Sequence, residues 1–182
     1  YYPNKIDLYN KMRDKGEPAD EITMILRNDD VDKLQSIISN VQNPKLIVPF
    51  NIYENFVPNG GTDFLNYSAA YGSIKCFKYL LLNHANLDNL SMSYAIFGGN
   101  TEIIRTIDQK YKVNYHSLNK ETYVYQKYGD NKYNDRYLCY DSLVLSSPIY
   151  LTIMMHKYDL FDWITDEKIK SDELSNDSLV DF

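Results

Sequence analysis

The stretch that decides the fold is residues 65–87, whose sequence is LNYSAAYGSIKCFKYLLLNHANL. It divides into a short alanine-bearing segment and a second segment with apolar residues at helical spacing, Ile74, Phe77, Leu80 and Leu81. Gly72 lies between the two segments, where a residue without a Cβ lets the backbone reverse at little cost. The stretch therefore predicts two short helices joined by a turn. Helices this short need stacked neighbours to bury their apolar faces.

The same pattern recurs elsewhere in the chain, with the turn position held by Asp29, Gly72, Gly99 and His156. Gly99 follows Gly72 by 27 residues. This register places large apolar residues in two columns, Leu34, Phe77, Ile104 and Phe161 in the first and Ile37, Leu80, Ile107 and Ile164 in the second. We expect helix pairs near residues 19–40, 63–85, 91–110 and 148–166. A non-repetitive helical bundle also produces apolar stripes, but the small-residue turn and the 27-residue step favour repeats.

A single domain over residues 1–170 is expected, with irregular insertions at 41–62 and 111–146 and an acidic tail at 171–182. The first insertion carries two apolar runs, 46–48 and 52–57, which predict that it docks on the helices as an ordered segment. The second insertion is rich in Tyr, Asn, Lys and Asp. It is either a degenerate repeat or a long loop.

Composition excludes several classes of protein. Among the 182 residues, 44% are hydrophobic and 24% are charged, which favours a packed core over disorder. The net charge of −6 argues against nucleic acid or an anionic membrane as the main partner. No apolar run approaches the roughly 20 residues of a membrane span. The first residues have no signal-peptide pattern. They also lack an initiator Met, which is typical of a processed form or a fragment.

The two cysteines, Cys76 and Cys139, lie far apart and favour a reducing, intracellular setting, which we expect to be the cytoplasm. The chain also contains 18 tyrosines. These indicate either the codon bias of an A/T-rich genome or a tyrosine-rich binding surface, and the two are compatible.

The turn register resembles the ankyrin repeat, in which a small-residue pair precedes a turn glycine and an apolar second helix. Residues 99–105, GNTEIIR, are the closest single match. More narrowly, residues 20–166 are similar to divergent ankyrin-type proteins expanded in certain protists, which carry a domain of unknown function. The resemblance implies an α-solenoid and a protein-binding role. The Thr-Pro-Leu-His start of a typical ankyrin repeat is absent, so short or missing β-hairpins between the repeats are expected.

No pattern of catalytic, metal-binding or cofactor-binding residues emerges. The three histidines, His84, His116 and His156, have no metal-ligand spacing, and no phosphate-binding loop is present. Cys139 paired with a histidine is the remaining enzymatic alternative, a thiol hydrolase, although no flanking motif supports it. We expect a protein that is not an enzyme and that has no cofactor.

In an ankyrin-like stack the first helix of each pair lines the concave face, and the exposed positions expected there are Tyr67, Tyr71, Tyr94, Phe97, Met154 and Met155. Large aromatic side chains in such positions give extensive contact area at low entropic cost. The first hypothesis is therefore a non-enzymatic module that binds another protein through these residues. Alternatively, the aromatic residues fill the interfaces between repeats. A second hypothesis is a structural or accessory subunit of a larger assembly.

Overall fold

The computed structural model describes residues 21–39, 47–48, 54, 56–57, 61–115 and 147–169. The helices of this part come in consecutive pairs, α2 (Glu21–Arg27) with α3 (Val31–Ser39), α4 (Phe64–Ala70) with α5 (Ile74–Leu82), α6 (Ser91–Gly98) with α7 (Thr101–Lys110), and α8 (Pro148–Met154) with α9 (Tyr158–Trp163). A π-helical segment, η3 (Ile164–Ile169), continues α9. Two short strands, β1 (Ile47–Val48) and β2 (Thr62–Asp63), pair antiparallel. The predicted all-α class is confirmed for the described residues.

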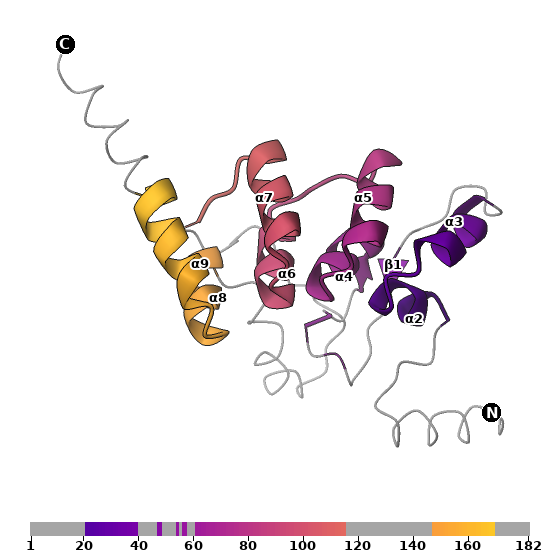
Figure 1. The fold of residues 1–182 in the computed structure, drawn as a ribbon, viewed down its shortest axis with the longest axis horizontal. Coiled ribbons are helices and arrows are strands. Elements are labelled where there is room, and N and C mark those ends of the chain that lie inside the picture. Colours follow the sequence, from indigo (N-terminus) through magenta and orange to yellow (C-terminus); the bar gives the residue numbers. More distant parts are fainter. Residues whose placement is uncertain are drawn as a thin grey trace, which may run out of the picture.

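The helix pairs lie side by side in the order of the sequence, from α2–α3 at the right of Figure 1 to α8–α9 at the left. The first helices form one layer, in which α4 contacts both α2 and α6, and α6 contacts α8. The second helices form the other layer, in which α5 contacts α3 and α7. Each described inner pair is thus covered by a pair on either side.

The turns within the pairs share one backbone conformation. The residue at each turn is left-handed, with φ of 54° at Asp29, 67° at Gly72, 73° at Gly99 and 54° at His156. Three of these turns also share a hydrogen bond from the residue after the turn to the carbonyl five residues earlier, Asp30 to Ile25, Ser73 to Ser68 and Lys157 to Thr152. This bond is the mark of a Schellman motif. The predicted turn positions are confirmed.

Side chains at the turns also join neighbouring pairs. The Asp29 carboxylate accepts from the backbone N–H groups of Lys75 (3.1 Å) and Cys76 (2.8 Å), at the start of α5. Asn100 caps its own helix and donates from Nδ2 to the carbonyl of Gly72 at 2.9 Å. The register found in the sequence therefore also determines which turns contact each other.

The two apolar columns form the centre of the core. Leu34, Phe77 and Ile104 are buried in the first column, and Leu80, Ile107 and Ile164 in the second. Phe161 and Ile37 are partly buried, and both belong to the pairs at the ends of the row. Both column positions are buried in the two inner pairs, whereas each end pair has one buried and one partly buried column residue.

The described residues of the first insertion also enter the core. β1 pairs with β2 at Ile47–Asp63 and Val48–Thr62, directly before α4. Val48, Phe56 and Val57 are buried in the same cluster as the helix columns. The predicted docking of this segment is confirmed for these residues. Residues 116–146 and the tail 171–182 lie outside the described residues, so the choice between a degenerate repeat and a loop stays a prediction.

Candidate interaction surface

The six residues expected to bind a partner separate into two groups. Tyr67, Tyr71, Tyr94 and Phe97 lie on the inner helices α4 and α6 and at their ends. Met154 and Met155 lie at the end of α8, in the last pair of the row. The two groups have different surroundings.

Phe56, from the first insertion, lies among the four inner aromatic residues. Its ring centroid is 5.9 Å from that of Tyr67, 5.6 Å from Tyr71, 6.4 Å from Tyr94 and 5.0 Å from Phe97. Offset and edge-to-face contacts at such distances are favourable for aromatic pairs. We call these five residues the aromatic cluster.

The expected exposure is wrong for Tyr67 and Tyr94, which are 0% and 1% exposed. The physical reason is the packing of Phe56 against their rings, together with the first helices on either side. Tyr71 and Phe97 are partly buried. The alternative interpretation, in which aromatic residues fill interfaces within the stack, describes Tyr67 and Tyr94. A direct role of these side chains in binding stays a prediction that no observation tests.

Two hydroxyl groups of the aromatic cluster bond to one buried carboxylate. Oε1 of Glu54 accepts hydrogen bonds from the hydroxyl groups of Tyr67 and Tyr71, both at 2.5 Å. Burial and the bond to Glu54 raise the pKa of Tyr71 to about 12, and they raise the pKa of Tyr67 well above its ordinary value. The guanidinium of Arg27 lies over the Tyr71 ring, 4.7 Å from its centroid. Both phenols therefore stay neutral and hold Glu54 against α4.

Sequence reasoning missed Glu54 and Phe56 as members of this cluster. The available signal was an acidic residue inside the apolar run 52–57, which indicates a buried carboxylate with its own hydrogen-bond donors.

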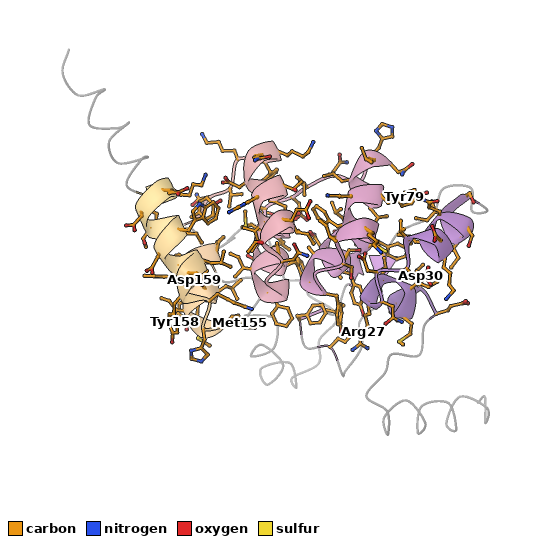
Figure 2. All side chains as sticks on the ribbon, in the orientation of Figure 1. Arg27, Asp30, Tyr79, Met155, Tyr158 and Asp159 are labelled. Carbon is orange, nitrogen blue, oxygen red and sulfur yellow. The ribbon has the colours of Figure 1, made fainter. Side chains whose placement is uncertain are left out.

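The last pair carries an exposed apolar surface instead. Tyr150 is 49% exposed, Ile153 47%, Met154 46% and Tyr158 59%. Met155 is partly buried. We call the four exposed residues the end face, and Figure 2 shows the labelled Tyr158 at the outer end of the row. The expected exposure of Met154 is confirmed.

Two of the end-face positions, those of Tyr150 and Ile153, are buried in the other three pairs. Counted back from the turn residue, Tyr150 and Ile153 correspond to Thr23 and Leu26 in α2, Asn66 and Ala69 in α4, and Ser93 and Ile96 in α6, all of them buried. In α4 the following pair covers them, since Asn66 contacts Asp88 in the loop before α6, and α6 lies on the carbonyl of Ala69. The end face is therefore a stacking surface that no described helix covers.

The opposite end of the row is polar. Cys76 and Ile103 occupy one position in the second helix of the inner pairs, and both are buried. The equivalent residue in α3 is Lys33, whose side chain is 67% exposed and forms an ion pair with Asp30 at 2.8 Å. A polar outer surface is typical of a terminal repeat. The two ends of the described row thus differ in character.

Two described residues of chemically reactive types are Cys76 and His156. Burial, reinforced by the nearby Asp29 carboxylate, raises the pKa of Cys76 to about 12, so its thiol stays protonated. His156 lies at a turn, with Nδ1 2.9 Å from the Tyr158 hydroxyl. In the described part, no three His, Cys, Asp or Glu side chains come together as a possible metal site. His116 and Cys139 lie outside the described residues.

None of the described helices is both long and apolar enough to cross a membrane.

Comparison with known proteins found no matching family model, no matching curated protein and no matching solved structure.

Proposed function

We propose that this chain is a non-enzymatic protein-binding module, built as an α-solenoid of ankyrin-type repeats. The serial packing of helix pairs, with left-handed turns at equivalent positions, supports the repeat assignment. Because Cys76 is a free, buried thiol, we further propose a reducing, cytoplasmic setting.

The observation that carries the binding proposal is the end face. Four large apolar side chains are each about half exposed there, and two of them, Tyr150 and Ile153, hold positions that are buried in the other pairs. Exposed apolar patches with polar surroundings mark interaction sites in folded proteins. The proposal therefore moves the partner contact from the concave aromatic residues to α8 and the start of α9, and it retains Met154 as a contact residue.

The test compares partners retained by three forms of the chain in quantitative affinity capture from the source cell. Ile153→Lys places a charge in the end face, and Leu82→Lys places the same charge on α5, where Leu82 is 81% exposed. We expect a protein that is retained by the wild type and by Leu82→Lys and lost with Ile153→Lys. Equal retention by all three forms would contradict binding through the end face. Size-exclusion chromatography of the lysate separates such a module from a permanent subunit, which would elute in one stable high-mass peak.

A further inference from the structure

The junctions inside the row show what kind of surface covers an end face. The side of α4 formed by Asn66, Ala69 and Ala70 is covered by α6, another first helix. The approach is close, since a Cβ at Gly98 of α6 would lie 2.2 Å from the carbonyl oxygen of Ala69. α6 in turn contacts α8. An α-helix running alongside α8 is therefore the occupant for which the end face is shaped.

The size of the side chains specifies this helix further. At the positions where α4 carries Asn66, Ala69 and Ala70, α8 carries Tyr150, Ile153 and Met154. Packed helices interdigitate large side chains of one with small side chains of the other. A helix that packs on these bulky residues needs short apolar side chains at its contact positions.

Charged residues on the second helices indicate which charge a partner would carry beside the last pair. Lys78, the sixth residue after the turn at Gly72, forms an ion pair with Glu102, the third residue after the next turn. Arg105 and Asp159 hold the same two positions at the next junction, again with opposite charges. In the last pair the sixth position holds Asp162, which is exposed and takes part in none of the ion pairs between described residues. The residue that complements it is basic.

A second copy of the chain fits this surface poorly. Head-to-tail stacking would place the exposed, charged Lys33 end against the apolar end face. A face-to-face dimer would bring two Asp162 side chains to one interface between molecules of net charge −6 each.

We propose that the end face binds a helix pair of another protein, with short apolar side chains against Tyr150, Ile153 and Met154 and a Lys or Arg against Asp162. This inference rests on the proposed function and names the chemistry of its partner. The partner continues the stack, and its basic residue takes the place that Glu102 has beside Lys78.

The test uses the full chain and a cross-linked helical hairpin as the probe. The hairpin carries the sequence of residues 91–110, made in two forms, one with Glu102 and one with Glu102→Lys. Fluorescence anisotropy measures the affinity of each form. We expect the Lys hairpin to bind about fivefold more tightly than the Glu hairpin, because one exposed charge pair contributes about 1 kcal/mol. Asp162→Lys in the chain should reverse this preference.

Ile153→Lys should abolish binding of both hairpins, whereas Leu82→Lys should leave binding unchanged. Circular dichroism serves to check that each variant is folded. We expect both to fold, because both positions are exposed. Equal affinity for the two hairpins, no binding of the Lys hairpin, or a chain dimer that Ile153→Lys dissociates would overturn the proposal. A cellular protein lost with Ile153→Lys, beside hairpins of equal affinity, would leave the binding function intact and reject only the partner chemistry. If the hairpins bind as expected but no cellular protein is lost with Ile153→Lys, the proposed function is rejected instead.

Discussion

The aromatic cluster and the end face are made of similar side chains in different surroundings. Tyr67 lies on α4, and Tyr150 and Ile153 lie on α8, so each region includes residues of a first helix. In the cluster, Phe56 and Glu54 from the first insertion fill the space over the rings and satisfy two hydroxyl groups. At the end face, Tyr150 and Ile153 have no such cover among the described residues. Apolar character alone therefore does not distinguish a packed surface from an open one.

The largest effect on stability is expected from a substitution in the aromatic cluster. Tyr67→Ala removes a fully buried ring and one of the two donors to Glu54. We expect the free energy of unfolding to fall by about 3–5 kcal/mol, the usual cost of replacing a buried aromatic residue by Ala. Urea denaturation measures the change.

Met154→Ala is the matched control for this variant, because Met154 is 46% exposed on the end face. We expect it to change stability by no more than about 0.5 kcal/mol. A similar loss in both variants would mean that the end face is packed in solution, and it would remove the distinction between the two regions.

An intermediate effect is expected at the junction between α4 and α6. A Cβ at Gly98 would lie 2.2 Å from the carbonyl oxygen of Ala69 and 2.8 Å from that of Ala70, and backbone atoms cannot move aside easily. We expect Gly98→Ala to destabilise the chain by about 1–3 kcal/mol, in spite of the higher helix propensity of Ala. Thermal unfolding followed by circular dichroism measures it. Ile153→Ala tests the exposed surface of α8 in the same measurement. A loss of stability as large as that of Gly98→Ala would show that a helix already covers this surface.

The smallest effect concerns the phenols of the aromatic cluster. The pKa of Tyr71 is raised from 10.0 to about 12, so the folded state favours its neutral form. That contribution to stability is complete below pH 10.0 and is lost as the pH rises to about 12. In the tyrosinate absorbance of the folded protein, Tyr71→Phe should remove amplitude only in the upper part of this window. In urea the difference in amplitude between the wild type and Tyr71→Phe should instead fall in the ordinary pH range of tyrosine ionisation. If Tyr71→Phe removed absorbance amplitude in the ordinary pH range of tyrosine ionisation while the protein is folded, a tight hydrogen bond from Tyr71 to Glu54 would be refuted.

Much of the fold follows from local sequence. The positions of Asp29, Gly72, Gly99 and His156 predict the left-handed turns, because a helix reversal needs one residue in that region of backbone space. The spacing of the apolar columns predicts which helix faces enter the core. Both features depend on residues within a few turns of each other along the chain. Long-range features such as the hydrogen bonds that Tyr67 and Tyr71 donate to Glu54 could not be found in this way.

The sequence by itself determined the pairing of helices, the turn positions and the apolar columns. Only the tertiary structure decided which apolar side chains are covered. Burial depends on the neighbour across the interface, and that neighbour comes from a different part of the chain, as Phe56 does for Tyr67. For Tyr150, Ile153 and Met154 no described residue supplies it. Equivalent positions in the repeat therefore form a closed core in α4 and an open surface in α8.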